Sequence, residues 1–401
     1  MRVDDCGSMT SASNRISGNP VAILGGGPVG LTLALLLAKR SVPSVVFDAR
    51  SVEQASADRH LLALSLGSLQ TLGALVELPR DAQAPIRAVI VSSVGQFGRA
   101  VIGERDAGSE ILGGTIRYGD LITVLSAAAE ANEFISVRRS LKVLSVRQSP
   151  SSVQIELQGQ PPYTAPLALS AEGLGTEPAE PPSQSALVAD LEVTGIERGS
   201  ACERFTRDGP LALLPLPTRT ALGATSGAQK MALVWCMSNA QADRRSALTD
   251  SALIDELGTQ LGERQLRVIS VRARNRFPLY ERARDELVEH RIAYLGNAAQ
   301  TLHPVAGQGL NLGLRDGAVL AELIGADYSA GNDPMQSLHP YARSRRADRA
   351  AIVALTRTAP AFFATRFAPI ALARSIGLTA LAVVPNLRRD FARLLMFGVR
   401  F

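Results

Sequence analysis

The sequence predicts an α/β protein in which an antiparallel sheet is inserted into a domain built on a parallel sheet, with helices at the C-terminal end. One observation is the order strand, glycine-rich turn, helix and strand between residues 21 and 48. Another is a series of apolar segments between residues 184 and 237, separated by turns rather than helices, which indicates antiparallel strands. The 401 residues, 46% of them hydrophobic, can bury two modest cores.

A Rossmann-like unit is expected near the start of the chain. Two apolar runs, 21–24 and 44–47, have the composition of buried parallel strands, and a helical segment, 31–39, lies between them. This order binds the pyrophosphate of a dinucleotide at the N-terminus of the helix. The alternative left open is a glycine-rich turn that holds no ligand.

Four residues of this unit have defined roles in the pattern. Gly25 makes the tight turn, Gly27 lets the backbone approach a pyrophosphate, and Gly30 lets the helix pack on the strand. Asp48, directly after the second strand, is expected to bind the ribose hydroxyls of an adenosine. An acid at this place favours a ribose without a 2′-phosphate.

A second glycine-containing block, 294–316, is expected to contain a short buried strand, a long polar loop and a helix that begins near residue 310. Gly307 and Gly309 remove side chains where the backbone approaches a flat or charged group. The helix N-terminus directs unpaired N–H groups and a positive dipole end at the same place. The block therefore predicts an anion site, which includes Gln308, Leu310 and Asn311.

These motifs carry a family resemblance. The turn 25–30 with Asp48, Arg59 and the block 296–316 resemble the FAD-dependent aromatic hydroxylases, and more narrowly the hydroxylases of ubiquinone biosynthesis. Segment 203–217 is similar to the narrower group as well. The resemblance implies a Rossmann-like FAD-binding domain with an inserted antiparallel-sheet substrate domain, as in para-hydroxybenzoate hydroxylase.

The resemblance also implies an activity. A flavin reduced by NAD(P)H would react with O2 to a C4a-hydroperoxide and hydroxylate the aromatic ring of a polyprenylated phenol in ubiquinone biosynthesis. One alternative is a flavin-dependent reductase or dehydrogenase of the same fold, and another is a FAD-stabilised subunit without catalysis in the biosynthetic complex. The ring position, the quinone precursor, the choice of NADH or NADPH and the oligomeric state stay open.

The resemblance gives roles to further residues. Arg59 would lie beside the flavin and its pyrophosphate, although a plain surface arginine is the alternative. Asn297 would bind the ribityl chain, where the wider class has aspartate. His303 and Pro304 would lie near the C4a edge. His303 is assigned no base role, because a structural hydrogen bond explains it equally well.

One motif departs from the family pattern. Hydroxylases of this class carry an Asp-Gly pair after a strand, followed by an arginine, whereas this chain has Glu172 and Gly173 followed by the loop 174–183 without arginine. Glu172 keeps a carboxylate and is expected to contact FAD. In the resembling family this motif is also held to touch the nicotinamide donor, so the substitution bears on the use and identity of that donor.

The expected domain boundaries follow from these segments. Residues 1–19 form a disordered tail; 20–84, 112–180 and 272–342 the FAD-binding domain; 85–111 and 181–271 the substrate domain; and 343–401 a helical segment. Apolar residues of the inserted sheet are expected to wall the substrate pocket, with the protein core as the alternative. The candidates are Phe97, Leu213 and Trp235.

The C-terminal segment is the part suited to a lipid surface. From residue 343 it carries eleven arginines and only two acids, and its apolar stretches are too short to span a bilayer. A basic amphipathic surface can lie on anionic lipid or on a partner protein, while the alternative is packing on the core. We therefore expect a cytoplasmic protein, with docking on the inner face of the cytoplasmic membrane or in a ubiquinone-biosynthesis complex left open.

Other classes of function find little support in the sequence. The three cysteines, Cys6, Cys202 and Cys236, lack the spacing of a metal site or a disulfide framework. The sequence shows no Ser-His-Asp arrangement that would indicate a catalytic chemistry other than that of a flavin. We expect a lipophilic phenolic substrate, no metal and no nucleic-acid partner.

Overall fold

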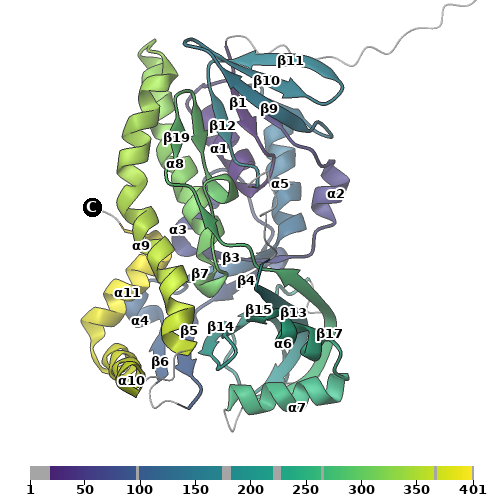
Figure 1. The fold of residues 1–401 in the computed structure, drawn as a ribbon, viewed down its shortest axis with the longest axis vertical. Coiled ribbons are helices and arrows are strands. Elements are labelled where there is room, and N and C mark those ends of the chain that lie inside the picture. Colours follow the sequence, from purple (N-terminus) through teal and green to yellow (C-terminus); the bar gives the residue numbers. More distant parts are fainter. Residues whose placement is uncertain are drawn as a thin grey trace, which may run out of the picture.

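The computed structural model describes residues 19–95, 99–173, 182–219, 227–262, 266–364 and 368–399. A six-stranded sheet forms the centre of the first domain, in the order β19-β20-β12-β1-β2-β8 (Figure 1). Its neighbouring strands are parallel, except at the edge strand β19. The strands are β1 Val21–Leu24, β2 Ser44–Phe47, β8 Ile135–Arg138, β12 Ala168–Ser170, β19 Val288–Glu289 and β20 Ile292–Tyr294.

Helix α1 Pro28–Ala38 packs against this sheet and against two further helices, α5 Tyr118–Glu130 and α8 Gln308–Ser329. The predicted strand-helix-strand unit is confirmed, since β1 pairs in parallel with β2 and α1 connects them. α1 begins at Pro28, earlier than predicted, because proline suits the first turn of a helix. β1 and β2 are buried along their whole length, which explains why both are continuous apolar runs.

Two smaller sheets adjoin this core. The first is an antiparallel sheet at the top of Figure 1, formed by β9 Val143–Gln148, β10 Val153–Leu157 and β11 Gln160–Ala165. The second lies between the two domains and comprises β3 Leu61–Ser65, β4 Gln83–Ile86 and β7 Gly113–Arg117, with α2 Val52–Ser56, α3 Leu66–Gly73 and η1 Arg80–Ala82 in its connections.

The inserted domain is a seven-stranded sheet in the order β17-β13-β16-β15-β14-β5-β6. All neighbours are antiparallel except β14 and β5. The sheet therefore combines both predicted segments of the substrate domain, although β17 continues past the expected boundary at residue 271. Its strands are β5 Ala88–Ser93, β6 Arg99–Ile102, β13 Gln184–Thr194, β14 Ser200–Phe205, β15 Pro210–Pro215, β16 Gln229–Ser238 and β17 Arg267–Pro278.

Two helices, α6 Asn239–Ser246 and α7 Asp250–Leu261, close one face of the inserted sheet. Between these two helices the chain turns at Leu248. Thr249 then starts α7, and its hydroxyl accepts a hydrogen bond from the backbone N–H of Ala252 at 3.3 Å. The residues packed between α6, α7 and the sheet form a hydrophobic core separate from that of the first domain.

Helices from the C-terminal part of the chain run along the side of both domains (Figure 1). They are α9 Leu338–Ala364, α10 Ala368–Val383 and α11 Pro385–Phe397, of which α9 begins before the expected boundary at residue 343. Short elements complete the described part of the chain: α4 Glu104–Ala107, β18 Arg282–Ala283, β21 Gln300–Thr301, and the 3₁₀ turns η2 Gly296–Ala298, η3 Val305–Gly307 and η4 Pro334–Ser337.

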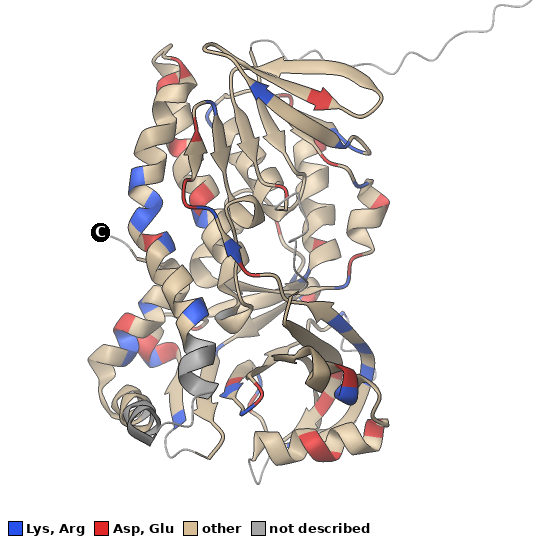
Figure 2. Cartoon of the chain, viewed as in Figure 1, with Lys and Arg blue, Asp and Glu red and all other residues tan. Residues whose placement is uncertain are grey.

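Ion pairs join α9 to α8, and Figure 2 colours basic and acidic positions along α9. Arg345 donates from Nε to Asp316 Oδ1 at 2.6 Å and also bonds Asp348, and Arg315 Nε lies 2.9 Å from Asp348 Oδ2. Asp348 Oδ1 accepts the backbone N–H of Val399 at 2.9 Å, so the residue after α11 joins the same network. Several of the C-terminal arginines therefore serve internal contacts.

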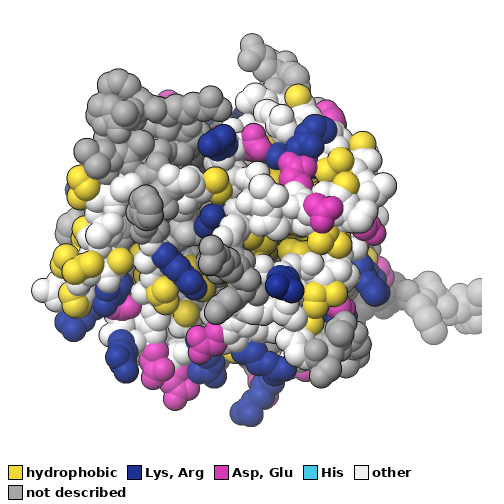
Figure 3. Space-filling view, turned by 90° about the horizontal axis from the view of Figure 1, so that it is seen from below, with side chains coloured by type: hydrophobic (Ala, Val, Ile, Leu, Met, Phe, Trp, Pro, Cys, Tyr) yellow, Lys and Arg dark blue, Asp and Glu magenta, His cyan; other side chains and the backbone are white. Residues whose placement is uncertain are grey.

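The surface of α10 and α11 carries exposed apolar residues. Within the described residues no helix is both long and apolar enough to cross a bilayer. In the view from below, hydrophobic and basic side chains lie together on the left, the side that these helices occupy in Figure 1 (Figure 3). The large exposed hydrophobic residues of this region are Ile376, Val383, Val384 and Leu387.

Candidate cofactor and substrate site

Two glycines of the first turn are required by the chain itself. Gly25 has a φ of +104°, and a Cβ atom there would lie 2.8 Å from the backbone nitrogen of Glu172. A Cβ atom on Gly30 would lie 1.9 Å from the carbonyl oxygen of Gly25. No side chain fits at such distances, so both glycines permit the close packing of β1, α1 and the end of β12.

Gly27 differs, because the side of its backbone where a Cβ would stand is open. Its φ of −79° and ψ of −175° suit any residue, and the nearest described atom to a Cβ would be Tyr118 Oη at 3.5 Å. Gly27 precedes α1, and none of the described side chains caps that helix end. The turn thus offers uncapped N–H groups and free space, an arrangement that fits the pyrophosphate of a dinucleotide.

Asp48 lies at the end of β2, beside this turn. The backbone N–H of Gly26 donates to Asp48 Oδ2 at 2.7 Å, and the backbone N–H of Arg50 donates to Oδ1 at 2.7 Å. Arg139 Nη1 is 3.9 Å from Oδ2. The carboxylate therefore braces the glycine turn, and its contact with a ribose stays a prediction.

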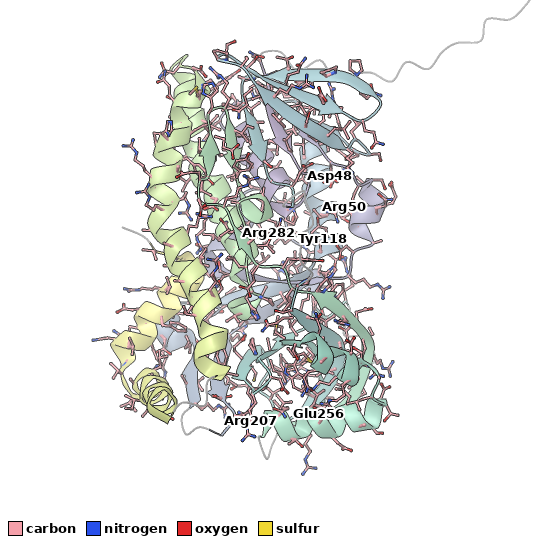
Figure 4. The ribbon with its side chains drawn as sticks, viewed as in Figure 1. Asp48, Arg50, Tyr118, Arg207, Glu256 and Arg282 are labelled. Carbon is pink, nitrogen blue, oxygen red and sulfur yellow. The ribbon has the colours of Figure 1, made fainter. Side chains whose placement is uncertain are left out.

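A polar pair that the sequence analysis missed lies beside Asp48. Arg50 donates from Nη2 to Tyr118 Oη, and its guanidinium carbon lies 5.1 Å from the centre of the Tyr118 ring. Asp48, Arg50 and Tyr118, three of the side chains labelled in Figure 4, lie close together there. Burial is the main cause that raises the pKa of Tyr118, so the phenol stays protonated at neutral pH. The sequence signal for this pair was the position of Arg50, two residues after Asp48.

Glu172 follows β12 and lies against Gly25. The Glu-Gly pair that replaces the family's Asp-Gly pair is therefore still located at the nucleotide turn. Burial raises the pKa of Glu172, and the negative charge of Asp48 raises it further. A cofactor or donor that brings positive charge or N–H donors to this place would favour the ionised form. Contact of Glu172 with FAD stays a prediction.

The turn η2 presents Asn297 outward. Asn297 is exposed, whereas its neighbours Gly296 and Ala298 are buried. Gly296 has a φ of +54°, and a Cβ atom on Gly313 would lie only 2.8 Å from the Cα of Gly296. This close glycine contact seats η2 directly on α8, which leaves the Asn297 side chain free to reach a ligand, as the ribityl role requires.

The N-terminus of α8 is also built from glycine. Gly307, with a φ of +58°, precedes the helix, and none of the described side chains caps its end. A Cβ atom on Gly309 would find no described atom within 4 Å. The first turn of α8 is therefore open on the side of Gly309, which suits a planar or anionic group at the helix dipole. Leu310 is only partly exposed next to it.

The side chains of Asn311 and Gln308 form hydrogen bonds within the protein that the sequence analysis did not predict. The side-chain oxygen of Asn311 accepts the backbone N–H of Ser65 at 2.8 Å, and its amide nitrogen donates to the carbonyl oxygens of Ala63 and Gly307 at 3.0 and 2.8 Å. Gln308 Nε2 donates to the carbonyl oxygen of Leu395 at 3.3 Å. The Asn311 amide therefore fastens α8 to β3, and a cofactor contact of Asn311 stays a prediction.

Arg59 lies in the connection before β3, with its side chain exposed. Its carbonyl oxygen accepts a hydrogen bond from Arg117 Nη1 at 2.7 Å. The backbone of Arg59 is therefore positioned by β7, while its predicted contact with the flavin and pyrophosphate stays a prediction.

His303 is buried between η2 and η3, with an exposed fraction of 2%. Within the described part of the chain neither of its ring nitrogens has a hydrogen-bond partner. Burial lowers the pKa of His303 to about 4, so the ring is neutral at pH 7. Neither a structural hydrogen bond nor a base role finds a partner in these residues.

The buried imidazole predicts an acid-sensitive fold. Between its ordinary pKa of 6.5 and its folded pKa of about 4, the unfolded chain binds a proton that the folded chain does not. The free energy of unfolding should therefore fall as pH decreases through this window, by about 3 kcal/mol in total. Urea denaturation between pH 7.5 and pH 4 measures this. His303→Asn should flatten the dependence, whereas the exposed His339→Asn should not; equal pH slopes in wild type and His303→Asn would refute the assignment.

A cavity of about 360 Å³ lies where the loop before α8 meets the inserted sheet. Its lining is mostly apolar and comes from four places: the loop and α8, the β3–β7 sheet, one face of the inserted sheet, and the C-terminal helices. The residues are Pro304, Val305, Gly307, Gln308 and Asn311; Leu61, Ala63, Leu64, Ser65, Ile86, Leu112 and Gly113; Val89, Val91, Ala201, Cys202, Glu203, Phe205, Ala212, Leu214 and Val234; and Leu355, Leu381, Phe391, Leu395 and Met396.

The predicted lining residues of the inserted sheet need correction. Leu213 and Trp235 are completely buried in the core beneath α6 and α7, and do not line the cavity. Their neighbours Ala212, Leu214 and Val234 line it instead, because successive side chains of a strand point to opposite faces. Phe97, the third candidate, lies outside the described residues.

The C-terminal wall of the cavity was also missed. Leu355 of α9, Leu381 of α10 and Phe391 of α11 line the cavity, although the sequence analysis assigned this segment to docking or to general packing. Short apolar stretches separated by arginines gave no signal for a pocket wall. Within the described residues no cluster of His, Cys, Asp and Glu has the arrangement of a metal site, and Cys202 and Cys236 are both buried.

Comparison with known proteins agrees with this geometry. The family model described as an FAD binding domain matches residues 19–172 and 177–356. A ubiquinone hydroxylase of Rhodospirillum rubrum is 30% identical over 96% of this chain and 91% of its own, and 3-demethoxyubiquinol 3-hydroxylase of Escherichia coli is 26% identical over 92% and 96%.

A solved structure shares the fold. The p-nitrophenol 4-monooxygenase of Pseudomonas putida superposes with a TM-score of 0.73 at 18% identity, covering 96% of this chain and 99% of that one. At this identity the likeness concerns the fold alone. Together with the family model and the relatives, it leads to one conclusion: the chain belongs to the FAD-binding domain family, among the FAD-dependent hydroxylases related to those of ubiquinone biosynthesis.

Proposed function

We propose that this protein is an FAD-dependent monooxygenase that hydroxylates the aromatic ring of a polyprenylated phenol in ubiquinone biosynthesis, with NAD(P)H as electron donor. One observation carries the proposal: the loop before α8 and the first residue of that helix, through Pro304, Val305 and Gln308, form part of the wall of an apolar cavity. A phenol in that cavity would lie beside the loop expected to hold the flavin. The activities named for the related hydroxylases support the same reaction.

The chain's own groups fit the tasks of such an enzyme. Reduced FAD supplies the activation of O2 when it is bound. The N-terminus of α1 would hold its pyrophosphate, and the N-terminus of α8 would stabilise negative charge on its ring system. Asn297 would orient the ribityl chain, and the apolar lining of the cavity would exclude water from the reacting ring.

The proposal is tested with purified, FAD-loaded protein, NADPH or NADH, and 2-prenylphenol as a short substrate. Oxygen consumption together with a product heavier by one oxygen atom is the expected result. NADPH oxidation without an oxygenated product would favour a reductase, and no flavin reduction by either donor would favour a non-catalytic subunit. Complementation of bacterial strains that each lack one ubiquinone hydroxylase would then identify the ring position.

The membrane side of the proposal rests on α10 and α11. The exposed apolar residues Val383, Val384 and Leu387 lie close in sequence to Arg389 and Arg393, which are exposed as well. Apolar side chains flanked by cations suit the surface of an anionic bilayer. The same helices line the cavity, so docking there would bring a lipid-dissolved substrate close to its site.

Full-length protein is therefore expected to sediment with anionic liposomes at low salt and to be largely released at high salt. The double variant Arg389→Glu/Arg393→Glu should bind more weakly. Arg388 is left unchanged, because its Nε donates to Asp106 Oδ1 at 2.8 Å and secures α11 on α4. Arg198→Glu/Arg267→Glu, at exposed positions of the inserted domain, is the matched control. Equal binding of both double variants would contradict the docking surface and favour a partner protein.

A further inference from the structure

The wall that the C-terminal helices give to the cavity is apolar throughout its described residues. The lining side chains that carry nitrogen or oxygen belong to β3, β14 and α8, and they are Ser65, Glu203, Gln308 and Asn311. The described lining residues of α9, α10 and α11 are Leu355, Leu381, Phe391, Leu395 and Met396. The cavity therefore has polar groups near the start of α8 and on the inserted sheet, and a purely hydrocarbon and thioether surface on the side of the C-terminal helices.

An apolar stripe on α11 leads from the protein surface into this wall. Leu387, Phe391 and Leu395 are spaced by four residues, so they lie on one face of the helix, about one turn apart. Leu387 has an exposed fraction of 44%, whereas Phe391 and Leu395 line the cavity. At a rise of about 1.5 Å per residue the stripe is about 12 Å long. These three residues, the α11 stripe, therefore run from the surface to the cavity.

The two ends of the α11 stripe have different surroundings. At the inner end the carbonyl oxygen of Leu395 accepts a hydrogen bond from Gln308 Nε2 at 3.3 Å, and Gln308 is the first residue of α8. The inner end therefore adjoins the helix terminus at which the flavin is expected. At the outer end Leu387 follows the exposed residues Val383 and Val384, at the junction of α10 and α11. That junction belongs to the surface proposed to dock on lipid.

A prenylated phenol is divided along its length in the same way. Its ring carries the hydroxyl group and has to reach the flavin, whereas its isoprenoid chain is purely apolar. Leu355, Leu381 and Phe391 are only partly buried within the protein. Burial of apolar surface is favourable roughly in proportion to its area. An isoprenoid chain on this wall would thus bury the remaining apolar surface of these side chains together with its own.

We propose that the α11 stripe, with Leu355 and Leu381 of the same wall, binds the isoprenoid chain of the substrate. The ring enters first and lies near the start of α8, and the chain extends along α11 towards the lipid surface. Because the stripe is short, it holds the first isoprene units, and the rest of a long chain stays in the lipid. The inference deepens the proposed function and rests on it, because a prenylated substrate is assumed.

The test compares 2-methylphenol, 2-prenylphenol and 2-geranylphenol as ligands of the FAD-loaded protein in the absence of lipid. Binding is measured by the perturbation of the flavin absorption spectrum and by calorimetry, neither of which requires turnover. The affinity of the wild type should rise about 10-fold or more with each longer substituent, because each step buries further apolar groups. Phe391→Asn, which puts an amide in the middle of the stripe, should weaken binding of 2-geranylphenol about 10-fold or more and that of 2-methylphenol little.

Leu214→Asn, on the wall formed by the inserted sheet, is the matched control and should keep the wild-type ratio of the affinities for 2-geranylphenol and 2-methylphenol. Leu387→Asn changes an exposed residue, so it tests the stripe even if Phe391→Asn does not fold, and it should weaken 2-geranylphenol alone.

The proposal is overturned if the wild type binds the three phenols equally, or if the folded variants of the stripe keep the wild-type ratio. A ratio lowered by Leu214→Asn but not by the stripe variants would also overturn it, because the chain would then lie on the inserted sheet. Oxygenation is scored separately: if 2-geranylphenol binds along the stripe but no oxygenated product forms, the proposed function fails while this inference stands.

Discussion

Gly27→Val should leave the protein folded but unable to retain FAD. The backbone at Gly27 accepts a branched residue, yet its side chain would fill the open space in front of α1 where the pyrophosphate is expected. We expect FAD affinity to fall by a factor on the order of 100 or more, since the helix N-terminus loses its ligand. The flavin absorbance of the purified variant and a titration with FAD measure this.

The contrast with other glycines makes the experiment specific. Gly30→Val should disrupt folding rather than cofactor binding, because its Cβ would lie 1.9 Å from a carbonyl oxygen. Gly258→Val, in α7, is the matched control, as a Cβ there meets no described atom within 4 Å. Stoichiometric FAD in folded Gly27→Val would mean that the pyrophosphate lies elsewhere.

Asp316→Ala should destabilise the fold by about 3–5 kcal/mol, the usual loss when one partner of a buried ion pair is removed. Asp316 is completely buried and accepts hydrogen bonds from Arg345 at 2.6 Å and from Gln300 at 3.4 Å. Burial raises the pKa of Asp316, and the charges of Arg345 and Arg315 oppose that shift. Without the carboxylate, a buried guanidinium would lose one of its partners.

Urea denaturation of the FAD-loaded protein at pH 7 measures the change in the free energy of unfolding. The matched control is Asp243→Ala, since Asp243 pairs with Arg276 at the surface and should contribute less than about 1 kcal/mol. Because Gln300 follows η2 closely, Asp316→Ala should also loosen the turn that presents Asn297 and weaken FAD binding. Equal stability losses in the two variants would show that the buried network is no stronger than a surface pair.

The nucleotide turn could be predicted because its constraints are local. The positive φ of Gly25 and the steric limit at Gly30 act between residues that are near in sequence or on adjacent strands. The apolar runs of β1 and β2 likewise report their burial directly. The second block was located correctly for the same reason, since the turns at Gly296 and Gly307 require glycine at their left-handed φ angles.

The substrate wall could not be predicted in the same way. Both faces of the inserted sheet are apolar, and nothing in the strands themselves distinguishes the face covered by α6 and α7 from the face that borders the cavity. Leu213 and Trp235 were candidates as apolar residues of this sheet, but their side chains lie in the core beneath α6 and α7. Because successive side chains of a strand point to opposite faces, the neighbours Ala212, Leu214 and Val234 line the cavity instead.

By itself the sequence determined the nucleotide turn, the glycine-built helix terminus at α8 and the insertion of an antiparallel sheet, because backbone sterics and hydrophobic periodicity act over a few residues. Only the tertiary structure decided which face of that sheet borders the cavity and that α9, α10 and α11 close it. Those outcomes depend on packing between segments that are far apart in the sequence. Hydrophobic burial has no preferred direction, so apolar surface is buried by whichever element reaches it.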